Sequence, residues 1–138
     1  MARIIMAEDD EIVSEIAVGA LIDAGHAVGL LDNGEDALRV IRQRRPDLVI
    51  LDCNIPALSG VLVLRKMREL PELADTPVLM LTGRQSERDT EIAYFTGAND
   101  YMTKPFDPDE LVFRVGELLK QTVSSHKGAR HVSGVARG

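Results

Sequence analysis

Short apolar runs alternate with longer amphipathic stretches along most of this chain, and this alternation limits the possible folds more than any other feature. Each apolar run is four or five residues long, which is typical of strands buried on both faces. Strands are expected at 4–7, 27–31, 48–51, 78–81 and 98–102. Each is followed by a stretch with helical spacing, and helices are expected at 12–24, 37–41, 61–67, 86–96 and 108–121.

Five strand–helix units in a row favour one fold class. Parallel strands need crossover connections, so the alternation predicts an α/β domain: a doubly wound, five-stranded parallel sheet with five helices on its two faces. Ligands of such sheets bind beyond the carboxyl ends of the strands. The periodic pattern ends near residue 123. We therefore expect a domain at 1–122 and a disordered basic tail or linker at 123–138.

The first and last helices carry the clearest signals. In the first, one apolar stripe is formed by Ile12, Val13, Ile16, Ala17, Ala20, Leu21 and Ala24. In the last, Asp107 is suited to the N-cap and Pro108 to the first helical position. Both helices should pack one face against the sheet.

Composition excludes several classes of protein. The net charge is −6, and residues 123–138 carry +3, so an acidic body argues against direct nucleic-acid binding by the domain. Cys53 is the single cysteine, which rules out an internal disulfide and makes a cytoplasmic location the expectation. No apolar run approaches the roughly 20 residues of a membrane-spanning helix, and the first residues lack a signal-peptide layout.

Polar residues that could take part in catalysis or ligand binding follow four of the expected strands. The first strand runs into Glu8-Asp9-Asp10, the third into Asp52, the fourth into Thr82-Gly83, and the fifth is followed by Lys104-Pro105. Because the carboxyl ends of parallel strands lie along one edge of the sheet, these side chains should converge there. Any one of them alone would be an ordinary turn, cap or surface residue. Their occurrence together at one edge of the sheet is what indicates a functional site.

The convergent set suits a hard cation and a phosphoryl group. Clustered carboxylates repel one another unless a cation intervenes. An oxygen-only donor set favours Mg²⁺ or Mn²⁺ over zinc. Lys104 and the Thr82 hydroxyl match two phosphoryl oxygens, and Asp52 is the best placed nucleophile, since carboxylates form acyl phosphates.

These residues lie in segments that resemble the receiver domains of two-component response regulators. The matching segments are Ile-Ile-Met-Ala-Glu-Asp-Asp at 4–10, Leu-Asp-Cys-Asn-Ile-Pro-Ala-Leu-Ser-Gly at 51–60, Met-Leu-Thr-Gly at 80–83 and Gly-Ala-Asn-Asp-Tyr-Met-Thr-Lys-Pro-Phe at 97–106. Their separations also fit, with 43 residues from Asp9 to Asp52, 30 to Thr82 and 22 to Lys104. The resemblance covers residues 3 to about 121 and implies a flavodoxin-like strand order of 2-1-3-4-5.

The resemblance assigns a role to each site residue. Asp52 would accept the phosphoryl group, Asp9 would bind the metal directly, and Glu8 would bind it through water. The Asn54 carbonyl would complete the metal site. Thr82 and Tyr101 would form the switch, with Tyr101 turning inward when Thr82 moves onto the phosphate. Lys104 would bind the phosphate and precede a cis peptide to Pro105. Asn54 and Arg84 would affect the lifetime of the phosphate.

Two other classes of protein agree less well with these residues. A Mg²⁺-dependent phosphatase with an aspartyl-phosphate intermediate needs an acid two residues after its nucleophile, and Asn54 cannot act as a general acid. A flavin-binding module needs a phosphate loop after the first strand, where this chain has an acidic run. Neither alternative accounts for the whole set.

The resemblance also implies partners. The phosphodonor would be a sensor histidine kinase or a histidine phosphotransfer protein. A downstream protein, or a second copy in a phosphorylation-dependent dimer, would bind residues 86–121. The chain would act as a switch and not as a turnover enzyme, limited to self-phosphorylation and slow self-dephosphorylation.

Overall fold

A computed structural model gives the fold of residues 1–83 and 96–131, and it describes side chains only as far as Gln121. The strands are β1 (Arg3–Ala7), β2 (Ala27–Leu31), β3 (Leu48–Asp52), β4 (Val78–Thr82) and β5 (Asp100–Thr103). The helices are α1 (Glu11–Asp23), α2 (Gly34–Arg44), α3 (Gly60–Glu69), α5 (Pro108–His131) and a short 3₁₀ helix, η1 (Pro71–Leu73). The helix expected at 86–96 lies almost wholly outside the described residues.

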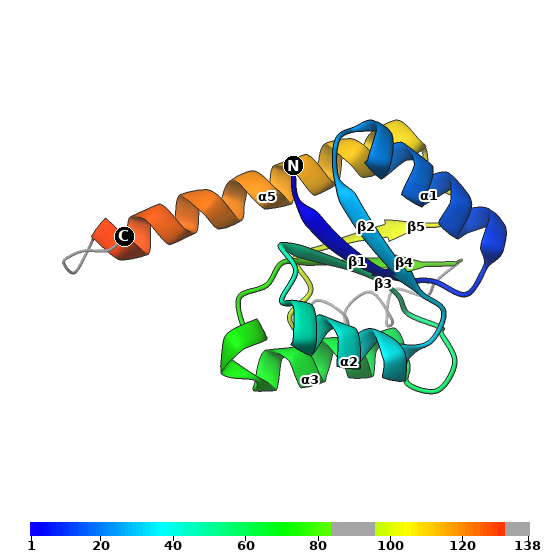
Figure 1. Ribbon diagram of the computed structural model, residues 1–138, viewed down its shortest axis with the longest axis horizontal. Helices are drawn as coiled ribbons and strands as arrows, with labels where there is room; N and C mark the ends of the chain where they lie inside the picture. The colour runs from blue at the N-terminus through cyan, green and yellow to red at the C-terminus, as the bar shows by residue number, and fades with distance from the viewer. Residues whose placement is uncertain (84–95, 132–138) are drawn as a thin grey trace.

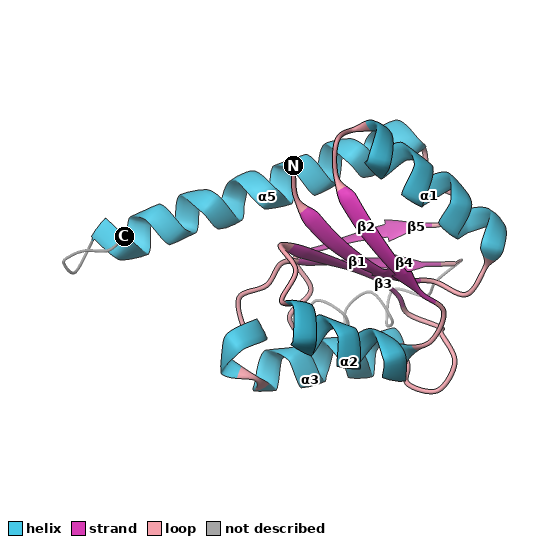
Figure 2. Ribbon diagram, in the orientation of Figure 1, coloured by secondary structure: helices cyan, strands magenta, loops and turns pink. Residues whose placement is uncertain are grey.

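The five strands form one parallel sheet in the order β2-β1-β3-β4-β5. Helices α1 and α5 cover one face, and α2 and α3 cover the other (Figure 1). The strand directions in Figure 2 agree, so every carboxyl end points to the same edge. The α/β class, the doubly wound sheet and its strand order are therefore as the sequence predicts, with four α-helices among the described residues.

Two apolar layers sandwich the sheet, because successive strand side chains point to opposite faces. In β3, Val49 and Leu51 join the layer beneath α2 and α3, whereas Leu48 and Ile50 join the layer beneath α1 and α5. Asp52 continues the second row and is the first polar residue in it. Strand alternation thus positions the nucleophile candidate at the end of a fully buried strand.

Side-chain caps begin the helices nearest the sheet edge. Asp10 accepts hydrogen bonds from the backbone N–H groups of Ile12 and Val13, at 2.9 and 3.1 Å. Asn33 caps α2 in the same way. The Asp107 side chain accepts from the Asp109 N–H, as expected for the start of α5. These caps fix the loops that leave the carboxyl ends of the strands.

The stripe predicted for α1 is partly wrong. Ile12 and Ile16 are 72% and 48% exposed, whereas Ser14, Ala17 and Leu21 are buried. The apolar positions of α1 form two adjacent rows with a spacing of four, and only the row through Ala17 and Leu21 faces the sheet. The sequence pattern does not reveal which row is buried.

Two boundaries differ from the sequence expectation. Pairing of β5 with β4 begins at Asp100, because Gly97 has a φ of +122° and Asn99 uses its side chain to accept from the Val78 N–H. Helix α5 continues to His131 and not only to residue 121, since no proline interrupts it. Among the described residues, no helix is both long and apolar enough to span a membrane.

Candidate functional site

The predicted site residues lie at the ends of four strands or directly after them, along the carboxyl edge of the sheet. Glu8 directly follows β1, Asp52 and Thr82 end β3 and β4, and Lys104 directly follows β5. Asp52 pairs with Leu81 in the strand register, and Thr82 pairs with Thr103. Residues that are up to 96 positions apart in the sequence therefore meet at one place.

Lys104 is the central contact of the site. Its Nζ donates to Glu8 Oε1 at 3.0 Å and to Asp52 Oδ2 at 2.9 Å. The side chains of Glu8 and Asp52 are 0% and 5% exposed, and that of Lys104 is 17% exposed. One ammonium thus bridges two nearly buried carboxylates, which agrees with the convergence predicted from the sequence.

Backbone donors hold the other oxygens of both carboxylates. Glu8 Oε2 accepts from the Asp10 N–H at 3.1 Å, and Asp52 Oδ1 accepts from the Asn54 N–H at 3.0 Å. Asp9 is exposed, yet an oxygen of its carboxylate lies within 4.8 Å of oxygens of Glu8 and Asp52. The carboxylates are therefore oriented toward one another by the loops that follow β1 and β3.

The charges in this cluster do not balance. Burial raises the pKa of Glu8, and the neighbouring Asp52 raises it further, while the bonds from Lys104 and the Asp10 N–H lower it in part. Burial lowers the pKa of Lys104, but its bonds to Asp52 and Glu8 outweigh burial and leave that pKa raised. The pKa of Glu8 is thus raised mainly by burial, and that of Lys104 is raised by its two carboxylate partners. The cluster retains an excess of negative charge that a cation would neutralise.

The donor chemistry fits a hard divalent cation. Glu8, Asp9 and Asp52 each offer a carboxylate oxygen, and neither His nor Cys belongs to this group. Oxygen ligands of this kind suit Mg²⁺ and Mn²⁺. The exposed Asp9 leaves the cluster accessible from solvent, as a site for a partly hydrated ion requires.

Thr82 ends β4, the strand next to β3, and carries a buried hydroxyl. The residue is fully buried, and among the described residues its Oγ1 has no hydrogen-bond partner. A buried hydroxyl without a partner costs about 1–3 kcal/mol, so its retention needs an explanation. An incoming anion at Asp52 would supply an acceptor for this hydroxyl. The Thr82 hydroxyl is therefore a second feature, after the carboxylate cluster, that indicates a phosphoryl ligand.

Tyr101 lies on the strand next to Thr82. It pairs with Met80 in β4, packs against the core layer beneath α2 and α3, and has a buried hydroxyl oxygen. The Lys104–Pro105 peptide is cis, as the sequence predicts. Arg84 lies outside the described residues, so its predicted effect on phosphate lifetime stays a prediction.

Sequence reasoning missed two glycines that position the loop after Asp52. A Cβ on Gly60 would collide with the Asp52 carbonyl oxygen, and one on Gly34 would collide with the Leu58 carbonyl oxygen. Gly60 N–H also donates to the Cys53 carbonyl, and Gly34 N–H to the Pro56 carbonyl. Both glycines let helices α3 and α2 approach the loop that carries Asn54. Their place at the first position of each helix is the only sequence signal.

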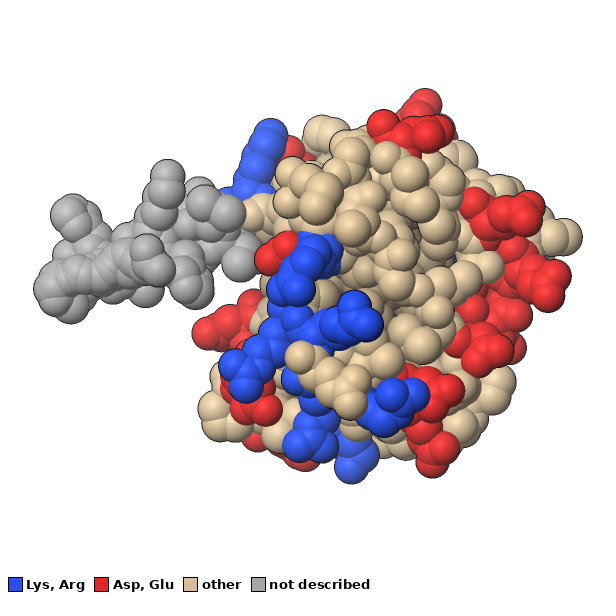
Figure 3. Space-filling model, in the orientation of Figure 1, with Lys and Arg blue, Asp and Glu red and all other residues tan. Residues whose placement is uncertain are grey.

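The charge distribution separates the two ends of the molecule. Acidic side chains line the right edge of the molecule in Figure 3, to which the strand arrows of Figure 1 point. Basic side chains gather in the middle and lower left of the same view. The site therefore lies at the acidic end of the visible face. A negative surface of this kind attracts cations to the cluster.

Known proteins share the sequence pattern and the fold of this chain. Residues 4–116 match the family described as the response regulator receiver domain. A DNA-binding dual master transcriptional regulator, RpaA, from a Synechocystis strain is 36% identical over 95% of this chain and 54% of its own length. The phosphate regulon regulatory protein PhoB of Rhizobium meliloti is 36% identical over 88% of this chain and 53% of its own. The chain spans about half the length of these curated relatives.

Solved structures agree. A response regulator from Chloroflexus aurantiacus superposes with a TM-score of 0.83 at 34% identity, covering 86% of this chain and 98% of that one. The receiver domain of a signal transduction histidine kinase from Syntrophus aciditrophicus gives a TM-score of 0.81 at 30% identity, covering 88% and 92%. The chain therefore belongs to the response regulator receiver domain family of two-component signalling.

Proposed function

We propose that this receiver domain is switched by transfer of a phosphoryl group to Asp52. The observation that supports it best is the pair of bonds from Lys104 to Glu8 and Asp52, beside the unpartnered hydroxyl of Thr82. This arrangement holds a nearly buried carboxylate next to a cation and a hydroxyl, both of which match phosphoryl oxygens.

The transfer step uses Asp52 as the nucleophile. One carboxylate oxygen of Asp52 attacks the phosphorus of a phosphohistidine, and a P–O bond forms while the P–N bond breaks. The electron pair of the broken bond returns to the imidazole nitrogen, which takes up a proton. Lys104 is already within hydrogen-bonding distance of Asp52, so its ammonium can offset the charge that develops on the transferred group.

A divalent cation, Mg²⁺ or Mn²⁺, would be held by Glu8, Asp9 and Asp52. We also assign the Asn54 backbone carbonyl to this site, because the bond from the Asn54 N–H to Asp52 keeps the backbone of this residue close to the carboxylates. When bound, the cation neutralises the carboxylates and the transferring oxygens. Asp9 is the exposed member and the accessible first contact for the ion.

Thr82 and Tyr101 would convert the new charge into a change of shape. Phosphorylation gives the Thr82 hydroxyl a charged acceptor, and such a bond contributes about 1.5–3 kcal/mol. Tyr101 already packs inward here, so phosphate would favour this position over an outward one. Asn54 and Arg84 are proposed to set how long the phosphate lasts.

The partners follow from this chemistry. The donor would be a sensor histidine kinase or a histidine phosphotransfer protein, and the output contact, to a downstream protein or a second copy, would lie within residues 86–121. Of that range, residues 96–121 expose β5 and one side of α5, including Phe113, which is 65% exposed. The domain would not turn over phosphate esters in many cycles, because Asn54 supplies no general acid.

The test is a labelling experiment on the full chain. Incubation with phosphoramidate and Mg²⁺ should add one phosphoryl group, seen by intact-mass spectrometry, and EDTA should abolish the addition. Asp52→Asn should remain unlabelled, whereas the exposed control Asp23→Asn should label like the wild type. Labelling of Asp52→Asn at the wild-type level would refute the assignment. Sustained hydrolysis of aryl phosphates would instead favour a phosphatase.

A further inference from the structure

Arg68, near the end of α3, makes a contact that the phosphoryl chemistry does not use. Its Nε and Nη2 donate to the Gly97 carbonyl at 3.1 and 2.9 Å, and Nη2 also donates to Asn99 Oδ1 at 3.0 Å. Its Nη1 donates to the carbonyls of Thr76 and Leu73 at 2.8 and 3.2 Å. A guanidinium has five N–H donors, so every donor is used. All the acceptors are neutral oxygens.

The chain leaves room for this side chain at one glycine. Gly97 has a φ of +122°, and a Cβ there would lie 3.0 Å from Arg68 Nε and 3.1 Å from its Cγ. The side chain therefore lies directly over the Gly97 backbone. A larger residue at 97 would meet both backbone strain and the guanidinium.

Asn99 extends the contact into the sheet. Its Oδ1 accepts from Arg68 and also from the Val78 N–H at 2.8 Å, while the Asn99 N–H donates to the Val78 carbonyl at 2.9 Å. Val78 is the first residue of β4, and Asn99 immediately precedes β5. Arg68 thereby ties α3, the loop after η1 and the start of the β4–β5 pair into one unit.

The opposite end of the same strand pair belongs to the phosphorylation site. Thr82 pairs with Thr103, and the Lys104 N–H donates to the Thr82 carbonyl at 2.6 Å. At about 3.3 Å per residue, the Arg68 contact and this end lie roughly 16 Å apart along β5. The strand pair is thus held at its start by Arg68, and Thr82 and Lys104 lie at its finish.

We propose that Arg68 is a positioning residue of the switch: it fixes Gly97 and Asn99 as a pivot, so that a change at Thr82 and Lys104 moves only the carboxyl end of β5. This inference rests on the proposed function of Asp52. A side chain that merely supported the fold would add stability without confining the change. The pattern of displaced residues therefore distinguishes the two roles.

The experiment maps backbone amides by NMR in the full chain before and after addition of Mg²⁺ and beryllofluoride, which stands in for the phosphoryl group. In the wild type, the amides of Thr82, Met102 and Lys104 should shift, and those of Gly97 and Asn99 should stay nearly unmoved. In Arg68→Lys, which has three donors in place of five, Gly97 and Asn99 should shift as well. The beryllofluoride concentration that gives half-saturation should be about fivefold higher than for the wild type.

The control is Arg65→Lys, an exposed position on the same helix, which should behave like the wild type. Wild-type spectra in which Gly97 and Asn99 shift as much as Lys104 would overturn the pivot while leaving the switch intact. So would an Arg68→Lys protein with the wild-type pattern. Spectra with no shift near Asp52 would instead contradict the proposed function.

Hydrogen exchange of the wild type keeps the proposal testable if Arg68→Lys fails to fold. Exchange of the Asn99 amide should be unchanged by Mg²⁺ and beryllofluoride, while that of the Lys104 amide should change, because its bond to Thr82 lies at the moving end. Equal changes at the two amides would overturn the pivot.

Discussion

Lys104 at the carboxyl end of the sheet and Arg68 at its amino end are both partly buried cations, and they are bound in opposite ways. At the carboxyl end, Lys104 contacts two carboxylates that are themselves nearly buried. At the amino end, the hydrogen-bond acceptors of Arg68 among the described residues are carbonyl oxygens of the backbone and of Asn99. The carboxylate partners of Lys104 can gain a proton or a phosphoryl group, whereas the carbonyl partners of Arg68 cannot.

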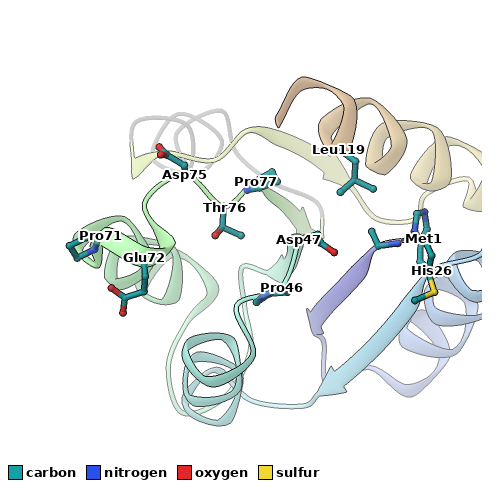
Figure 4. A pocket seen from close by; sticks show the side chains of 11 residues that line it. Met1, His26, Pro46, Asp47, Pro71, Glu72, Asp75, Thr76, Pro77 and Leu119 are labelled. Atoms are coloured by element: carbon teal, nitrogen blue, oxygen red, sulfur yellow. Dashed lines mark hydrogen bonds between the residues drawn. The ribbon is translucent and has the colours of Figure 1, made fainter. Parts of the chain in front are cut away.

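The surroundings of the two cations extend this contrast. At the carboxyl end, the Thr82 hydroxyl has no hydrogen-bond partner within the described part of the chain. The amino end has a cleft of about 660 Å³, whose labelled lining includes His26, Asp47 and Thr76 (Figure 4). There the Ala2 N–H donates to His26 Nδ1, and the Arg3 N–H donates to Asp47 at 2.7 Å. The described residues thus leave a buried hydroxyl without a partner at the carboxyl end, whereas His26 and Asp47 at the amino end accept hydrogen bonds from the backbone.

The largest effects are expected when either of the two cations is removed. Lys104→Met should lower the free energy of unfolding by about 2–4 kcal/mol at pH 8 in EDTA, since it leaves two facing carboxylates without a counter-ion. Arg68→Met should cost a similar amount, because it leaves buried carbonyls without donors. Urea unfolding at pH 5 and pH 8 distinguishes the two causes.

The deficit in unfolding free energy should depend on pH for Lys104→Met but not for Arg68→Met. The pKa of Glu8 is raised by burial, and loss of Lys104 removes a bond that lowers it. A carboxyl whose pKa is higher folded than unfolded is stabilising only while protonated, so stability falls as the pH rises through the folded pKa. The Lys104→Met deficit should therefore be smaller at pH 5 than at pH 8, and the Arg68→Met deficit should be equal at both. Lys120→Met, at an exposed ion pair, is the control. Equal deficits for Lys104→Met would contradict the electrostatic account.

Thr82→Val tests the unused hydroxyl. Replacing a buried, unpartnered hydroxyl with a methyl group should stabilise the metal-free protein by about 1 kcal/mol. Thermal unfolding should show the gain, and Thr103→Val, at the exposed partner position on β5, should show none. A lower melting temperature for Thr82→Val would mean that the hydroxyl is bonded in solution.

Asp9→Asn should have the smallest effect on stability. Asp9 is exposed, so relief of its repulsion with Glu8 and Asp52 should add only about 1 kcal/mol in EDTA. The same variant should lose most of the stabilisation that Mg²⁺ gives the wild type. Glu15→Gln, on the exposed side of α1, should leave both values unchanged. A decrease for Asp9→Asn in EDTA would identify its carboxylate as a structural acceptor.

The carboxyl end could be predicted from the sequence because its residues are local signals. Asp52 and Thr82 each follow an uninterrupted apolar run, and parallel topology alone brings strand ends together. Lys104 could be added because the fifth strand, although weak in pattern, precedes it. The contacts of Lys104 with Glu8 and Asp52 confirm that convergence.

Features that depend on packing, at either end of the sheet, could not be predicted in this way. Arg68 binds backbone carbonyls, which every residue has and no sequence pattern marks. The collisions that exclude a side chain at Gly34 and Gly60 depend on how closely helices approach a loop. The exposure of Ile12 likewise depends on which of two equivalent helix rows meets the sheet. These features need three-dimensional packing, not composition.

The span of sequence between Lys104 and its partners has a consequence for biosynthesis. Lys104 bonds to Asp52 across 52 positions and to Glu8 across 96. A ribosome makes the carboxylates first, and a chain still lacking β5 holds them without their ammonium. The acidic cluster therefore gains the counter-charge of Lys104 only when nearly the whole domain has emerged, so a half-made chain lacks the complete site that is proposed to accept the phosphoryl group.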